Sequence, residues 1–165
     1  MDQHAFTFKG DTILPWLITQ CGVSSAFDAD FDSGPHPAFR HFNGLWDTGA
    51  SRSVITSRVA AALGIAPIRK VMAKDARGDT VTNLYYVNIL LPNRMEVKNV
   101  AVTEGVLDGF DLLIGMDIIN LGDFSLTHRN GGTVFSFQIP STHEYDFVKQ
   151  IEQGVGVPKN KKKKK

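Results

Sequence analysis

The sequence predicts an all-β fold, either a sandwich or a barrel, and three observations support this prediction. Short runs rich in Val, Ile, Leu, Thr and Phe recur along most of the chain, separated at close spacing by polar or Gly/Pro-containing segments. One separator, Asn130-Gly131-Gly132, is a strong hairpin signal. A single Ala-rich stretch, residues 56–63, has the composition of a regular helix, so we expect little helix.

The first half of the chain opens with residues 1–12, whose mixed composition predicts nothing. The elements expected next are strands over residues 14–21 and 39–47, with a polar Gly/Pro-containing loop at 28–37 between them. The helix at 56–63 has Thr56 or Ser57 as a possible N-cap and Gly64 as its stop signal.

The second half is expected to consist of strands and turns. Strands are expected over residues 68–73, 80–91, 95–103, 111–115, 124–127 and 133–139, with one helical turn at 118–121. The first two flank the polar segment 74–79 and form a hairpin with an exposed tip, and the last two form a hairpin around the Asn-Gly-Gly turn. In the last strand Phe135, Phe137 and Ile139 alternate with polar residues, which is typical of one buried strand face.

The length of 165 residues and an apolar content of 42% fit one globular domain, which we place at residues 1–149 with a core at about 14–140. Residues 150–165 lose all periodicity and end in a lysine run, which predicts a basic, disordered tail. Without the six lysines at 159 and 161–165, twelve basic residues face seventeen acidic ones. The folded part is therefore mildly acidic, and nucleic acid is not expected as its partner.

The single cysteine, Cys21, excludes an intramolecular disulfide, the N-terminus lacks the basic start of a signal peptide, and no apolar run is long enough to span a bilayer. We therefore expect a cytoplasmic protein without a membrane partner. No cofactor or metal is expected, because the histidines lack zinc spacing and the acidic segment at 28–32 lacks the Gly and Glu of a calcium loop.

The candidate chemistry lies in the segment Leu45-Trp46-Asp47-Thr48-Gly49-Ala50-Ser51. Two apolar residues lead into Asp47, so its carboxylate is expected at the end of a buried strand. Gly49 lets the backbone turn sharply, and the Thr48 hydroxyl can hold the turn by hydrogen bonds. By itself the tripeptide could also be a simple turn. A second segment, Leu112-Leu113-Ile114-Gly115-Met116-Asp117, repeats the pattern of apolar residues followed by Gly.

Taken together, these segments resemble the retropepsin family, the retroviral-type aspartic proteases. Their residues are more similar to those of the cellular and bacterial members than to those of the viral ones. The resemblance covers residues 14–126 and comprises the Asp47 motif, the hairpin with its tip at 74–79, and the apolar segment ending at Ile114 and Gly115. It implies a closed β-barrel with a flap hairpin and one or two short helices. Viral members tend to carry Arg after that Gly, and Met116 stands there in this chain, so the viral type of salt-bridge network is not expected.

The resemblance also implies an activity and a set of site residues. An aspartic endopeptidase hydrolyses peptide bonds through a water activated by two carboxylates, and this chain supplies one, so a homodimer acting on a peptide or protein substrate is implied. Asp47 would be catalytic and Thr48 and Gly49 would support its loop. The residues implied to contact substrate are Ala50, Ser51, Ala76, Arg77 and Gly78, the last three as part of a lid.

A second function remains open at this stage. A retropepsin-like domain can serve as a peptide-binding or dimerisation module with little or no turnover. The intact Asp47-Thr48-Gly49 favours the enzyme, whereas the charged hairpin tip differs from the Gly-rich, apolar flaps of viral members.

Overall fold

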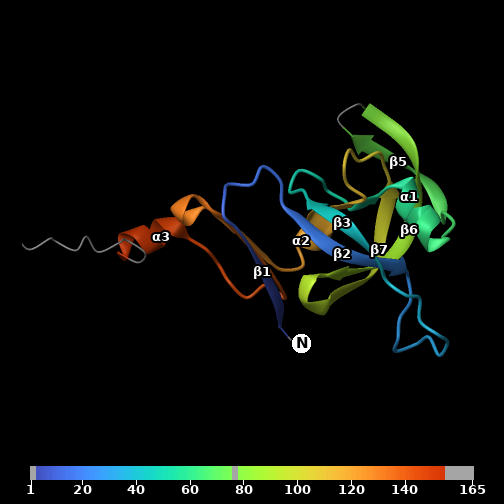
Figure 1. Ribbon diagram of the computed structural model, residues 1–165, viewed down its shortest axis with the longest axis horizontal. Coiled ribbons are helices and arrows are strands. Elements are labelled where there is room, and N and C mark those ends of the chain that lie inside the picture. Colours follow the sequence, from blue (N-terminus) through green and yellow to red (C-terminus); the bar gives the residue numbers. More distant parts are fainter. Residues whose placement is uncertain (1–2, 76–77, 155–165) are drawn as a thin grey trace, which may run out of the picture.

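The computed structural model describes residues 3–75 and 78–154, and six of its strands close into a β-barrel. The barrel lies on the right of Figure 1. The barrel strands are β2 (Ile18–Ser25), β3 (Arg40–Trp46), β4 (Val54–Ile55), β6 (Gly78–Leu91), β7 (Met95–Glu104) and β8 (Leu112–Ile114). Their order is β2-β3-β8-β4-β7-β6, and pairing of β2 with β6 closes the circuit. The expected closed all-β barrel is thereby confirmed.

The expected hairpin is also present. Strand β5 (Arg69–Asp75) pairs antiparallel with the first half of β6, in a register that places Met72 opposite Val81 and Asp75 opposite Gly78. In Figure 1 this hairpin rises from the barrel at the upper right. Ala76 and Arg77, at its tip, lie outside the described residues.

A separate three-stranded sheet lies beside the barrel, in the order β1-β10-β9. Its strands are β1 (His4–Gly10), β9 (Asp123–Thr127) and β10 (Thr133–Ile139), all antiparallel. The expected hairpin of β9 and β10 is confirmed, and a short 3-10 turn, η2 (Arg129–Gly131), joins them. Strand β1 was not expected. Its pairing with β10, more than 120 residues away, defines it as a strand.

An aromatic cluster connects the two sheets. Trp46, at the end of β3, is 5% exposed and packs on Phe135 and Phe137 of β10, with ring centroids 5.1 and 5.0 Å away. Phe6 of β1 and Phe124 of β9 complete the cluster. The alternation of Phe135 and Phe137 is therefore a buried strand face, as expected. The residue before Asp47 is thus held by both sheets.

The helices are short. Helix α1 (Ser57–Leu63) follows Thr56 and ends at Gly64, which adopts the left-handed conformation that glycine tolerates best, so both expected ends are confirmed. Arg58 of α1 forms a bidentate ion pair with the buried Asp111 before β8. Helix α2 (Met116–Ile119) starts two residues before the expected turn. A 3-10 turn, η1 (Pro92–Arg94), connects β6 to β7.

Two expectations about the chain ends need correction. The first predicted strand, 14–21, begins at Ile18 instead, because residues 14–17 form the turn that carries the chain from β1 into the barrel. Helix α3 (Phe147–Glu152) was not expected and crosses the proposed domain boundary at 149. Asp146 begins it by accepting a hydrogen bond from the Lys149 N–H. None of the described helices is long and apolar enough to cross a membrane.

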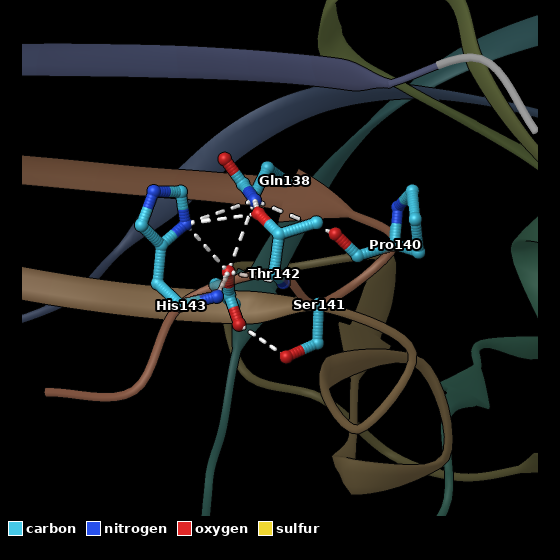
Figure 2. A network of polar contacts seen from close by, with 6 residues as sticks. Gln138, Pro140, Ser141, Thr142 and His143 are labelled. Carbon is cyan, nitrogen blue, oxygen red and sulfur yellow. Dashed lines mark hydrogen bonds and ion pairs between the residues drawn. The ribbon is translucent and has the colours of Figure 1, made fainter.

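A polar network fixes the chain beyond β10 to the start of β9 (Figure 2). The Asp123 carboxylate accepts hydrogen bonds from the Ser141 hydroxyl, at 2.5 Å, and from the backbone N–H groups of Thr142 and His143, both at 2.9 Å. Gln138 Nε2 and His143 Nδ1 contact the same carboxylate. The hydrogen bond from Ser141 is the largest of several that hold the pKa of Asp123 well below its usual range.

This network predicts an acid-dependent term in stability. Because the folded-state pKa of Asp123 is lowered, its stabilisation is complete above the unfolded value of about 3.9 and is lost as the pH falls further. We expect Asp123→Asn to lose less stability than the wild type when the pH is lowered from about 5 to about 2. Thermal unfolding followed by circular dichroism measures both curves, and parallel curves would contradict this assignment.

Cys21 is fully buried in the barrel, and desolvation raises the pKa of its thiol to about 11. Because its pKa is about 11 instead of 9.0, the fraction of Cys21 present as thiolate at pH 8 is lowered by about 100-fold. We expect native Cys21 to react with iodoacetamide at least about 100-fold more slowly than after unfolding in urea. Mass spectrometry of labelled protein gives both rates, and equal rates would show that the thiol is accessible.

Candidate active site

The loop from Asp47 to Ser53 leaves the barrel directly after β3. Asp47 is half-buried, and Thr48 and Gly49 are exposed. The Asp47 Oδ1 accepts a hydrogen bond from the Gly49 N–H at 2.8 Å, and the Ala50 N–H donates to the Asp47 carbonyl at 3.3 Å. The loop is therefore a tight turn that folds its own backbone around the carboxylate.

The first end of the loop is fixed by β3 and its neighbours. The Asp47 N–H donates to the Ile114 carbonyl at 3.0 Å, continuing the parallel pairing of β3 with β8. One residue earlier, the Trp46 indole N–H donates to Thr19 Oγ1 at 2.8 Å. Ring packing and hydrogen bonding together hold Trp46, and with it the start of the loop.

The second end of the loop is fixed by the second apolar-Gly segment, residues 112–117. The Met116 N–H donates to the Ala50 carbonyl at 2.8 Å. A Cβ added to Gly115 would lie 2.6 Å from the carbonyl carbon of Arg52, so only glycine fits this crossing. Ser53 contacts Asp117 through both its N–H and its hydroxyl. The Leu112–Asp117 segment is therefore the support of the Asp47 loop.

An open cleft of about 420 Å³ lies against the loop. Asp47 and Thr48 form one side of it, and Phe124 and Leu126 of β9 form another. The remaining wall consists of Pro15, Trp16, Leu17, Leu45 and Trp46. Since Leu126 is 42% exposed and Trp16 61%, the carboxylate lies beside an apolar surface that is open to solvent.

The two strands of the hairpin carry a pair of apolar residues, which the sequence analysis did not single out because it considered only the charged tip. Met72 and Val81 lie opposite each other and are both exposed. Alternate residues of a strand share a face, so Val81 lies on the same side of β6 as Tyr85 and Val87, which are buried in the barrel. This hairpin face therefore continues the apolar lining of the barrel beyond its end.

A polar group lies between that pair and the barrel core. The Tyr85 hydroxyl donates to Glu104 Oε2 at 2.6 Å, and Asn83 Nδ2 donates to the same oxygen at 3.2 Å. Burial, followed by the adjacent carboxylate, raises the pKa of Tyr85. Tyr85 therefore stays protonated and keeps Glu104 bound at the base of the hairpin.

The sequence-predicted residues fall into two groups. Asp47, Thr48, Gly49, Ala50 and Ser51 lie in one loop against Ile114 and Gly115. Gly78 begins β6 on the hairpin, and Ala76 and Arg77 lie outside the described residues. The residues that the sequence did not single out are Phe124 and Leu126 of the cleft, the Met72–Val81 pair, and the link between Ser53 and Asp117. Strand alternation alone could have indicated Val81; the others depend on contacts between distant segments.

The central part of the chain matches a known protein family. The family model "gag-polyprotein putative aspartyl protease" matches residues 40–120, which include the Asp47 loop, the hairpin and the Leu112–Asp117 segment. None of the curated proteins matches the sequence.

Several solved structures are similar to the chain. A retropepsin-like aspartic protease from Rickettsia conorii is 14% identical, with 84% of this chain and 96% of that one covered and a TM-score of 0.49. The simian foamy virus (mac) protease is 19% identical over 47% of this chain and 78% of its own, with a TM-score of 0.35. The retroviral protease-like domain of Ddi1 from Leishmania major is 18% identical over 65% and 89%, with a TM-score of 0.37.

The family match spans both the Asp47 loop and the Leu112–Asp117 segment that supports it. Over residues 40–120 the chain is similar to the gag-polyprotein putative aspartyl proteases, in agreement with the retropepsin-like resemblance of its motifs.

Proposed function

We propose that the chain is an aspartic endopeptidase whose active site forms when two copies bring their Asp47 loops together. The observation that carries the proposal is the placement of Asp47. Its carboxylate lies in a loop fixed at both ends and next to an open cleft. The loop also falls within the segment that matches the aspartyl protease family model.

The chemistry needs two carboxylates that share one proton. The ionised Asp47 takes a proton from a water held between the two side chains, and the water oxygen attacks the peptide carbonyl carbon. The protonated Asp47 of the second copy donates its proton to the carbonyl oxygen. In the breakdown of the tetrahedral intermediate, the first Asp47 donates the proton it took from the water to the amide nitrogen, and the second Asp47 takes a proton from a hydroxyl of the intermediate. The C–N bond then breaks and releases a neutral amine and a carboxylic acid, which restores the starting state of the pair.

The second copy is expected to bind along β9. Within the part of the chain that the structure describes, β9 pairs only with β10, so its other edge carries unpaired backbone donors and acceptors. Phe124 and Leu126 of β9 line the cleft beside Asp47. Antiparallel pairing of two β9 edges about a two-fold axis would form one six-stranded sheet and would draw the two Asp47 loops toward each other.

The substrate is proposed to be an extended peptide lying between the Asp47 loops and the hairpins. The Met72–Val81 pair supplies an apolar face for its side chains, and the loop backbone around Gly49 to Ser51 supplies polar groups for its main chain. The hairpin, including Gly78, would close over the peptide as a lid.

The direct test is digestion of a peptide library at several pH values by the purified protein, with products identified by mass spectrometry. Cleavage that requires Asp47 supports the endopeptidase. Peptide binding without cleavage at any pH would instead favour the peptide-binding module. Such a module has the same fold and forms the same dimer but does not hydrolyse peptides.

A further inference from the structure

The Asp47 loop depends on one carboxylate outside it. Ser53, where the loop re-enters the barrel, is 0% exposed, so every polar group it carries needs a partner. Its N–H donates to Asp117 Oδ2 at 3.0 Å, and its hydroxyl donates to Asp117 Oδ1 at 2.8 Å. Asp117, the second residue of α2, therefore binds Ser53 twice.

The same hydroxyl has a second role. Ser53 Oγ accepts a hydrogen bond from the Gly115 N–H at 3.1 Å, and the Ser53 carbonyl accepts one from the Thr103 N–H at 3.3 Å. Ser53 thus joins the loop, the turn before α2 and strand β7. Asp117 Oδ1 also accepts the Ile118 N–H at 3.1 Å, which fixes the carboxylate on α2.

We propose that Asp117 is a positioning residue for catalysis, which holds the Asp47 loop in its working conformation through Ser53. The inference rests on the proposed function and deepens it by assigning a role to a second carboxylate of the chain. Neither Asp117 nor Ser53 lines the cleft beside Asp47, so both act through the loop.

The link matters for rate because the reaction needs two carboxylates within hydrogen-bonding distance across two chains. The loop between its fixed ends contains exposed residues, Thr48, Gly49, Ser51 and Arg52, which have little packing of their own. Hydrogen bonds to an ionised acceptor are about twice as strong as those between neutral groups. Losing them at Ser53 frees the loop, and a displacement of about 1 Å at a reacting group costs about 100-fold in rate.

The link also joins the loop to the proposed dimer edge. Helix α2 ends at Ile119, and β9 begins at Asp123. Through Asp117, the catalytic loop is therefore attached to the same short segment that leads into β9. Assembly of two β9 edges and alignment of two Asp47 loops would thus depend on one rigid connection.

The experiment compares Asp117→Ala, Ser53→Ala and Asp117→Asn with the wild type, with Ser141→Ala as the matched control. Ser141 also donates its hydroxyl to a carboxylate, that of Asp123, away from the loop. For each protein kcat and KM are measured per folded dimer, after circular dichroism and light scattering have given the folded and dimeric fractions.

We expect Asp117→Ala and Ser53→Ala to lower kcat by about 100-fold and to change KM less than kcat, because the contacts proposed for the Met72–Val81 pair lie outside the loop. Asp117→Asn keeps an acceptor oxygen for Ser53 and should recover kcat to within about ten-fold of the wild type. Ser141→Ala should match the wild type. Folded, dimeric Asp117→Ala and Ser53→Ala proteins with unchanged kcat would overturn the proposal.

Hydrogen exchange of the Gly49 amide tests the link between Asp117 and Ser53 by a measurement that does not depend on peptide cleavage. That N–H donates to Asp47 Oδ1, so it reports the conformation of the loop. It should exchange at least about ten-fold faster in Asp117→Ala than in the wild type, and unchanged exchange would overturn the proposal. If the wild type cleaves no peptide, the proposed function fails, and the exchange result still decides the role of Asp117.

Discussion

Asp47→Asn is expected to lower peptide cleavage by about ten-thousandfold or more, because asparagine keeps the shape of the side chain but can serve as neither general acid nor general base. Both halves of the proposed dyad change at once in a homodimer, so no intact carboxylate remains. The wild type should show a bell-shaped dependence of rate on pH, since the pair releases its two protons in separate steps. The variant should show no such profile.

The Asp47→Asn protein should still fold and dimerise. Replacing two carboxyl groups that cannot both ionise cheaply at this distance is expected to leave the dimer equally stable or slightly more stable. The matched control is Asp32→Asn, because Asp32-Ser33-Gly34 has the spelling of a catalytic motif and lies in the exposed loop between β2 and β3. Asp32 Oδ2 there accepts a hydrogen bond from the Asp28 N–H. Near-wild-type cleavage by Asp47→Asn would remove Asp47 from the mechanism.

Leu126→Glu is expected to raise the dissociation constant of the dimer by about 100-fold. Leu126 is 42% exposed on the edge strand β9 and lines the cleft beside Asp47. Two copies of the substitution would face each other about the two-fold axis, so that each dimer would bury two repelling carboxylates. Analytical ultracentrifugation at a series of concentrations measures the change.

Activity should follow the same equilibrium. The rate per chain of Leu126→Glu is expected to be low at submicromolar concentration and to rise steeply as the protein is concentrated, since only the dimer holds a complete site. Phe31→Glu is the control, because Phe31 is 86% exposed in the loop between β2 and β3. Full activity of a protein that remains monomeric would refute the shared active site.

The two predictions separate chemistry from assembly. Asp47→Asn removes turnover and leaves the dimer, whereas Leu126→Glu removes the dimer and leaves each carboxylate in place. A protein that dimerises through β9 and binds peptides but never cleaves them would have the fold and the assembly of an aspartyl protease without its activity.

The sequence by itself determined the all-β class, the helix between Thr56 and Gly64 and the two hairpins, because these depend on patterns within a few residues. The Asp47 motif and its apolar-Gly counterpart were also visible, since the chemistry fixes their residue types. The first strand of the small sheet was not visible, because β1 gains its pairing from β10. Helix α3 was missed although its N-cap, Asp146, is a local signal, since the helix has only six residues.

Only the tertiary structure decided what surrounds Asp47. The cleft wall from β9, the aromatic packing on Trp46 and the link from Asp117 to Ser53 each join segments more than 60 residues apart. No local pattern marks such pairs, because a buried hydroxyl and a carboxylate look like ordinary polar residues until the chain folds and removes both from water. A polar group that loses its contacts with water on folding needs a hydrogen-bond partner inside the protein. This requirement exists only in the folded protein, so the partners cannot be identified from the sequence alone.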